Sequence, residues 1–332
     1  MFTNKDIRCF VPTCNRPKLL QMTLKTLLWQ EGGPWNIYVL DNSTNDETKE
    51  LIENNFPQIH YVDTRADRKF MANLRKLREL AISPYSLTLH DDDLLAPNYL
   101  KNALKILNSY PSINGIFAKF KIFHGGRFPV TVKFKNRGLK HWFINNKADF
   151  ALSFWDLPSC SWTGSILKSD LYRSVPIDNL YKTFGKIHDW PYLSEVIGQG
   201  KVCIFVDSYV YYRVHSNSDT HDDNTGVSLE QFKNWISYYK EFANKNSNLR
   251  KIYSDHIYDR ACIIYKYHLA NKYKQNCPNI EEFLKKENLL FAPISFWRKI
   301  RTKWYFKPFN RLARSFYNFG YYKQFLRDLP EK

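Results

Sequence analysis

Several features common in membrane and secreted proteins are missing from this sequence of 332 residues. No stretch approaches the roughly 18 uninterrupted apolar residues that a membrane-spanning helix needs. The first residues, MFTNKDIRCFVPT, lack the apolar core of a secretory signal. The six cysteines form no CxxC pair and no metal-type spacing, so we expect buried or inert thiols rather than a disulfide scaffold. These absences predict a cytoplasmic protein without a spanning segment.

The balance of charge is strongly basic, with 49 Lys and Arg against 32 Asp and Glu, a net charge of +17. This excess indicates an anionic partner, such as nucleic acid, an anionic lipid surface or a phosphorylated substrate. A content of 44% hydrophobic and 24% charged residues excludes wholesale disorder. Residues 296–327, the basic aromatic tail, hold nine of the cations, twelve aromatic residues and no acidic residue.

The first hundred residues alternate between short apolar runs and segments whose apolar residues have helical spacing. The expected strands are 7–11, 37–40, 59–62 and 86–89, and the expected helices are 18–29, 45–54, 69–81 and 97–107. Such alternation with short links predicts an α/β fold with a doubly wound sheet, parallel in this part of the chain.

The pattern changes further along the chain. Residues 116–154 and 201–214 are β-like, 155–180 combine loop and short helix, 215–225 form a polar loop, and 228–244 and 249–273 are helical. We therefore expect two domains, at about 150 residues per domain. The first, 1–225, has a Rossmann-like, doubly wound mixed sheet, and the second, 226–332, is a helical, basic extension that ends in the tail.

Polar residues follow three of the four expected strands, at the edge where parallel sheets collect ligands. The most prominent group is Asp91-Asp92-Asp93, because three adjacent carboxylates favour a compensating cation such as Mg²⁺ or Mn²⁺. A solvated acidic turn explains the triplet equally well. Asp41 follows the second strand and could instead cap the next helix. The residues Thr13 to Arg16 could be a simple turn between prolines.

The order and spacing of these groups resemble glycosyltransferase family 2, whose members have the GT-A fold. The resemblance rests on VPTCNRP at 11–17, VLDNST at 39–44, Asn73 and His90-Asp-Asp-Asp93, and it extends more loosely to about residue 216. It implies that a nucleotide-sugar donor binds a set of seven residues: Thr13, Asn15, Arg16, Asp41, Asn73, Asp91 and Arg213. It also implies a divalent ion on Asp92 and Asp93. At His90 the chain departs from the family, since many members carry Asp there.

Three later segments resemble family elements as well. Asp189, in KIHDW, matches the carboxylate that acts as general base in inverting members, although it could simply cap helix 190–197. YYRVH at 211–215 matches an element in which Arg213 or His215 could complete the diphosphate and metal site, and the alternative for His215 is an ordinary loop residue. Trp162 and Gly164 match the segment facing the acceptor, and a packed Trp is the alternative.

The resemblance implies an inverting, metal-dependent transferase that moves a sugar from a UDP-sugar to a glycan or lipid-linked acceptor, in synthesis of cell-surface polysaccharide. The tail at 296–327 would then seat the enzyme on the inner, anionic face of the plasma membrane. One alternative is a nucleic-acid-binding protein that uses this tail, although no upstream segment resembles such a module. A nucleotidyltransferase is a second alternative. The sequence argues against it, because the Gly-rich phosphate loop expected after the first strand is absent.

Overall fold

The computed structural model describes residues 1–66, 70–124, 141–144, 147, 162–198, 200–215, 228–245 and 286. The chain divides into two compact units, Met1–Trp235 and Ile236–Lys332. The first unit holds the sheet and every predicted site residue. The predicted helix at 249–273 and the basic aromatic tail lie outside the described residues. The division at 225/226 stays a prediction.

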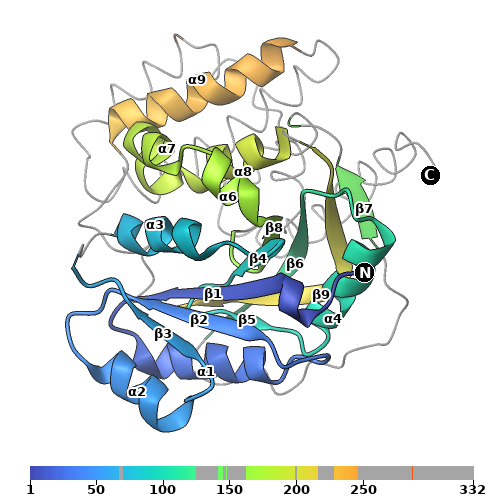
Figure 1. Cartoon of the computed structure of the whole chain (residues 1–332). Helices are drawn as coiled ribbons and strands as arrows, with labels where there is room; N and C mark the ends of the chain where they lie inside the picture. Colours follow the sequence, from blue (N-terminus) through green and yellow to red (C-terminus); the bar gives the residue numbers. More distant parts are fainter. Residues whose placement is uncertain are drawn as a thin grey trace, which may run out of the picture. The chain divides into compact units, whose positions relative to one another are not determined.

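The N-terminal half of the sheet consists of four parallel strands, as the alternating pattern predicts (Figure 1). These strands are β1 (Ile7–Thr13), β2 (Asn36–Asp41), β3 (His60–Asp63) and β4 (Tyr85–Thr88), in the order β3-β2-β1-β4. The connecting helices are α1 (Pro17–Leu28), α2 (Glu47–Asn55) and α3 (Phe70–Leu80), and α4 (Tyr99–Ser109) follows β4. The doubly wound α/β class is confirmed.

The C-terminal half of the sheet is mixed. Its strands are β5 (Leu94–Leu95), β6 (Gly115–His124), β7 (His141–Ile144), β8 (Ser165–Lys168) and β9 (Val202–Val214). β8 is antiparallel to both β4 and β6, β6 and β9 are parallel, and β5 and β7 each pair antiparallel with β9. Because β5 pairs with Val210 and Tyr211, the C-terminal end of β9 lies beside the loop between β4 and β5.

The prediction of loop and short helix over 155–180 is wrong for residues 165–168, which form β8. Four residues are too few to show a strand period, and the strand forms because tertiary contacts favour it. Ser165, Ile166 and Leu167 are buried, and all four residues of β8 pair with β4. The helices α6 (Ser169–Ser174) and α7 (Ile177–Phe184) follow, as short helices were expected to.

The core of the unit forms on both faces of the sheet. In α1 the residues Leu20, Leu24 and Leu27 are fully buried, at the spacing that turns them to one side of the helix. Figure 1 shows α1 and α2 on one face of β1–β3 and α3 on the other. Burial of each such leucine contributes about 2 kcal/mol to stability, so the strand ends beside α1 are firmly held.

The remaining described helices are α8 (Asp189–Gly198), preceded by a 3-10 turn at Gly185–Ile187, and α9 (Leu229–Lys245). Among the described residues, none of the helices has the length and apolar character needed to cross a membrane. Of the cysteines that the structure describes, Cys9 and Cys203 are buried, and burial raises the pKa of both thiols. Cys14 is exposed.

Candidate active site

The strands β2, β1 and β4 end side by side at one edge of the sheet, because they are parallel and in register. Thr13 at the end of β1 pairs with Asp41 at the end of β2. The backbone N–H of Leu89, just after β4, donates to the carbonyl of Phe10 at 3.0 Å. The polar residues that follow these strands therefore lie together, as the sequence predicts.

The loop of His90 to Asp93 is held from two sides. Oγ1 of Thr23, on α1, lies 2.9 and 2.8 Å from the backbone carbonyl oxygens of Asp91 and Asp93. On β9, the backbone N–H of Arg213 donates to Oδ1 of Asp93 at 2.9 Å, and its Nε donates to the carbonyl of Asp92 at 2.8 Å. The Arg213 side chain is 1% exposed and lies over the ring of Phe123. Arg213 therefore fixes the position of the loop through these two hydrogen bonds.

Asp91 lies inside the site and contacts two of the other predicted residues. Oγ1 of Thr13 donates to its Oδ2 at 2.7 Å, and Nη2 of Arg16 lies 3.1 Å from its Oδ1. The structure thus brings Thr13, Arg16 and Asp91 together. Both carboxylate oxygens of Asp91 therefore contact side chains of this protein, and the contact with Nη2 orients the partly exposed Arg16.

Asp92 has two basic neighbours on its Oδ2 atom. Nη1 of Arg16 lies at 3.3 Å, and Nε2 of His215, from the end of β9, lies at 3.0 Å. Burial by itself raises the pKa of Asp92, but His90, His215 and Arg16 together outweigh burial and lower this pKa below its usual value. The predicted residues Asp92 and His215 are therefore in contact.

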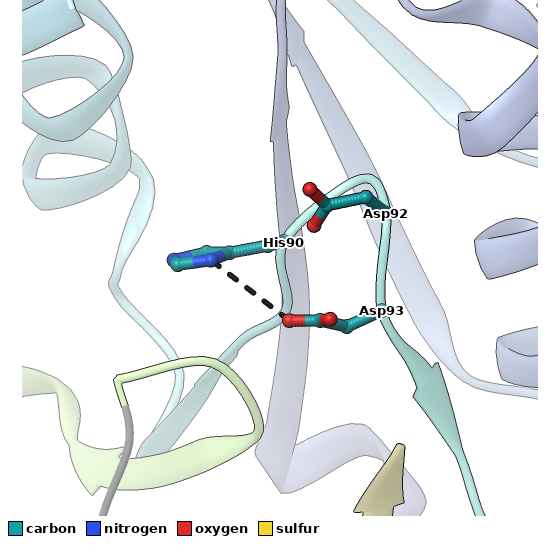
Figure 2. A group of neighbouring side chains, drawn as sticks. All are labelled: His90, Asp92 and Asp93. Carbon is teal, nitrogen blue, oxygen red and sulfur yellow. Dashed lines mark ion pairs between the residues drawn. The ribbon is translucent and has the colours of Figure 1, made fainter. Parts of the chain in front are cut away.

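Asp93 and His90 face each other across the turn (Figure 2). Nδ1 of His90 lies 3.9 Å from Oδ2 of Asp93, whose side chain is fully buried. Burial, followed by the nearby carboxylates of Asp92 and Asp91, raises the pKa of Asp93 well above its usual value. Asp93 thus has too little positive charge around it, which is the condition that a bound cation corrects.

The residues His90, Asp92 and Asp93 each offer one ligand atom, and these atoms all lie within 4.8 Å of one another (Figure 2). Two carboxylates and an imidazole suit a divalent ion. His90 was not among the predicted metal ligands, although many family members carry a carboxylate at this position. The signal in the sequence that could have identified His90 is its position directly after a strand and three residues before Asp93.

The end of β1 is tied to the end of β2 through Asn15, which has a left-handed backbone with φ of +56°. Its N–H donates to Oγ of Ser43 at 2.7 Å, and its Oδ1 accepts from the N–H of Thr44 at 2.8 Å. Asn tolerates this backbone better than most residues. The two loops thus form one rim beside Arg16.

Asp41 is fully buried and lies on the inner side of this rim. Its carboxylate accepts from the N–H of Ser43 at 2.9 Å and from the hydroxyl of Tyr61 at 3.0 Å. The alternative of a helix cap for Asp41 is wrong, since the residue at the N-cap of α2 is Asp46. Asp41 shapes the turn that presents Asn42, Ser43 and Thr44.

Asn73, on α3, is also buried at this edge. Its Nδ2 lies 3.3 Å from the carbonyl of Thr13 and 3.4 Å from Oδ1 of Asn42, and its Oδ1 accepts from the hydroxyl of Thr64. Asn42 was not among the predicted site residues. Its position next to Asp41, directly after the strand, is the signal that could have identified it.

The segment Trp162–Ser165 lies against the loop of His90. Oγ1 of Thr163 accepts from the N–H of His90 at 3.1 Å. Trp162 is 4% exposed and stacks on Tyr192 with ring centroids 4.4 Å apart, so it is a packed side chain. Gly164 has φ of +76°, and a Cβ there would meet Cγ2 of Val210 at 2.2 Å. Only glycine fits at this crossing.

Asp189 is the first residue of α8, and its side chain is 39% exposed. It is connected to the carboxylate loop through Trp162, whose ring lies 5.7 Å from that of His188. Thr163, the next residue, contacts His90. A carboxylate accessible to solvent thus lies on the helix that packs against Trp162, and the residue after Trp162 contacts the loop of His90.

Comparison with known proteins identifies the family. Residues 9–175, half of the chain, match Glycosyl transferase family 2. Protein CgeD of Bacillus subtilis (strain 168) is 20% identical over 168 residues, and the match spans 47% of this chain but only 37% of that protein.

Solved structures agree on the fold. The structure of S. aureus TarS 1-349 in complex with UDP-GlcNAc superposes with a TM-score of 0.51 at 14% identity, over 82% of this chain and 76% of that one. The complex of the same protein with UDP also has a TM-score of 0.51, at 14% identity, over 86% and 78%. The fold is of the GT-A type, and the chain belongs to glycosyltransferase family 2.

Proposed function

We propose that this glycosyltransferase moves a sugar, with inversion at the anomeric carbon, from a UDP-sugar to a hydroxyl of a glycan or lipid-linked acceptor, with Mg²⁺ or Mn²⁺. The observation that carries the proposal is the group of His90, Asp92 and Asp93 at the strand ends, with Arg16 beside it. A site with acidic ligands and an adjacent guanidinium suits a diphosphate–metal complex.

The donor set is supported by its position along the rim. Arg16 is the partly exposed cation of the site and would bind the diphosphate, while Asn15, Asn42 and Thr44 line the rim where the nucleoside would lie. Thr13, Asp41, Asn73, Asp91 and Arg213 support these groups from within. The TarS structure with UDP-GlcNAc makes a UDP-sugar the first donor to test.

Asp92, Asp93 and His90 would hold the metal ion, with His215 beside Asp92. The ion would supply Lewis-acid stabilisation of the departing diphosphate. Arg16 would neutralise part of the same charge, and Arg213 keeps the loop in place through Asp92 and Asp93.

Asp189 would act as the general base. The proton of the acceptor hydroxyl passes to its carboxylate while the acceptor oxygen forms a bond to the anomeric carbon. The bond from that carbon to the diphosphate oxygen breaks, and its electron pair leaves with the nucleoside diphosphate. Attack opposite to the leaving group inverts the configuration. Trp162 and Gly164 would shape the acceptor side by packing rather than by direct contact.

A thermal-shift screen of UDP-sugars with Mn²⁺ tests the donor, because a bound ligand raises the melting temperature by mass action. We expect one or a few UDP-sugars to stabilise the protein, and this stabilisation to disappear in EDTA and in Asp92→Ala. The rate of UDP release from that donor should also fall in EDTA and in Asp92→Ala. Full activity in excess EDTA, or the absence of any shift across the panel, would contradict the metal-dependent UDP-sugar reaction.

We further propose a place for the reaction in the synthesis of cell-surface polysaccharide, with the enzyme peripheral on the inner face of the plasma membrane. The composition of 296–327 supports this idea, since its cations suit anionic headgroups and its aromatic residues suit the interface. A lipid-linked acceptor stays in the membrane, so an enzyme bound at the surface would meet it there.

A further inference from the structure

Thr23, a fully buried residue of α1, contacts the backbone of the loop of His90 to Asp93. Its Oγ1 lies 2.8 Å from the carbonyl oxygen of Asp93 and 2.9 Å from that of Asp91. The carbonyl of Leu19, one helical turn earlier, is farther away at 3.4 Å. Since a hydroxyl has one hydrogen, the two nearer carbonyls share it in a three-centre hydrogen bond.

The carbonyl between these two is held from the other side of the loop. Nε of Arg213, on β9, donates to the carbonyl oxygen of Asp92 at 2.8 Å. Three successive peptide groups, those that follow Asp91, Asp92 and Asp93, thus each direct their carbonyl at a buried side chain. Because a peptide group is planar, holding its carbonyl oxygen restricts the orientation of the whole group.

The two carboxylates of the proposed metal site extend from Cα atoms that lie between these held peptide groups. Asp92 lies between a peptide held by Thr23 and the peptide held by Arg213. Asp93 lies between the peptide held by Arg213 and a second one held by Thr23. Each residue has two soft backbone dihedrals, so restricting the peptide on either side also restricts the direction of the Cα–Cβ bond. Thr23 therefore contributes to the direction of both carboxylates.

The same helix brings Arg16 to this loop. Arg16 is the residue at the N-cap of α1, and its Nη2 and Nη1 lie 3.1 Å from Oδ1 of Asp91 and 3.3 Å from Oδ2 of Asp92. Thr23 follows about two helical turns later. α1 thus contacts the side chains of the loop through Arg16 and its backbone through Thr23.

We propose that Thr23 is a positioning residue for the metal ligands: its hydroxyl holds the carbonyls of Asp91 and Asp93, and this keeps the carboxylates of Asp92 and Asp93 directed at one common point. The inference rests on the proposed metal site. A residue that supports metal ligands without touching the ion typically changes metal affinity by about 10- to 100-fold. Without the hydroxyl, two buried carbonyls lose a donor, which favours a rearranged loop.

A pair of variants that differ only in the hydroxyl tests this role. Thr23→Ser and Thr23→Ala both lose the methyl group, and only Thr23→Ser keeps the donor. The same pair at Thr26, a buried threonine about one turn further along α1, is the control. Oγ1 of Thr26 donates to the carbonyl of Thr23 at 2.8 Å and accepts from the N–H of Leu95 at 3.3 Å. The readouts are the Kd of Mn²⁺ with UDP present, from electron paramagnetic resonance, and the melting temperature without metal.

We expect Thr23→Ala to bind Mn²⁺ about tenfold or more weakly than Thr23→Ser, while the two Thr26 variants differ by about twofold or less. Both alanine variants should melt at a lower temperature than their serine partners, because each loses a buried hydrogen bond. Equal Mn²⁺ affinity in the Thr23 pair would overturn the proposal. An equal loss of affinity at Thr26 would also overturn it, since a general loosening of α1 would then explain both.

Thr23→Val is a second variant, which keeps the volume of threonine and covers the case in which Thr23→Ala does not fold. It should bind Mn²⁺ at least as weakly as Thr23→Ala, and an affinity equal to that of the native protein would show that the hydroxyl is not needed. If the native protein binds no Mn²⁺, the proposed metal site and this inference both fail. If the native protein binds Mn²⁺ and the Thr23 pair behave alike, only this inference fails.

Discussion

Nε2 of His215 lies 3.0 Å from Oδ2 of Asp92, although 123 positions separate the two residues in the chain. Nη1 of Arg16, which precedes Asp92 in the chain, lies 3.3 Å from the same oxygen. The carboxylate proposed to bind metal is thus balanced by groups of the chain itself. A metal ion that takes this oxygen must compete with both, and this competition can be measured.

Arg16→Ala should bind Mn²⁺ alone more tightly, by about three- to tenfold, because a competing ion pair with Asp92 is removed. The same variant should bind UDP in saturating Mn²⁺ about tenfold more weakly, because the guanidinium no longer meets the diphosphate. Titration of free Mn²⁺ by electron paramagnetic resonance and calorimetry with UDP give the two constants. Arg75→Ala, which breaks the exposed pair with Asp178, is the control and should change neither. Parallel changes in both constants would contradict the prediction.

His90→Asp should alter the preference among metal ions. An imidazole favours transition ions over Mg²⁺, whereas an all-carboxylate set suits Mg²⁺ and Mn²⁺ alike. We therefore expect the native protein to bind Mn²⁺ in preference to Mg²⁺, and His90→Asp to reduce this ratio several-fold. Calorimetric titration of both ions, in the presence of UDP, measures it. An unchanged ratio would mean that His90 is not a ligand.

Gly164→Ala should destabilise the fold by about 2–4 kcal/mol, since the added Cβ would overlap Val210 and the backbone is left-handed. Gly32→Ala is a matched control: its φ is +87°, but the nearest side-chain atom to a Cβ is 3.8 Å away. We expect about 1 kcal/mol there from the backbone alone. Urea unfolding of both variants tests the difference, and equal losses would show that the crossing with β9 can adjust.

The basic aromatic tail should give the full chain a preference for anionic vesicles. The test substitutes three tail cations by glutamine: Arg298, Lys299 and Arg301. The control substitutes three exposed lysines of the first unit: Lys5, Lys25 and Lys105. Each cation near an anionic surface contributes about 1 kcal/mol, so only the first set should markedly weaken co-sedimentation, and more at low salt. Equal binding by the two variants would place the membrane contact elsewhere.

Most of the parallel half of the fold could be predicted from the sequence, because local pattern decides it. The run at 7–11 is apolar and forms most of β1, although the strand continues through Pro12 to Thr13. The leucines of α1 repeat at helical spacing. The glycosyltransferase family could be predicted because the motifs that follow these strands, VPTCNRP, VLDNST and HDDD, resemble those of the family. β8 could not, because its four residues form a strand only between β4 and β6.

The sequence by itself determined which residues gather at the site, since the order of strands and the residues after each are properties of the chain. Tertiary structure alone decided what each side chain does there. Asp41 and Asp93 are both carboxylates after strands, yet Asp41 accepts from Tyr61 and Ser43 inside the fold, while Asp93 faces His90. The orientation of a side chain at a strand end depends on partners many residues away, here Tyr61, Arg213 and His215, which only the folded sheet brings into contact.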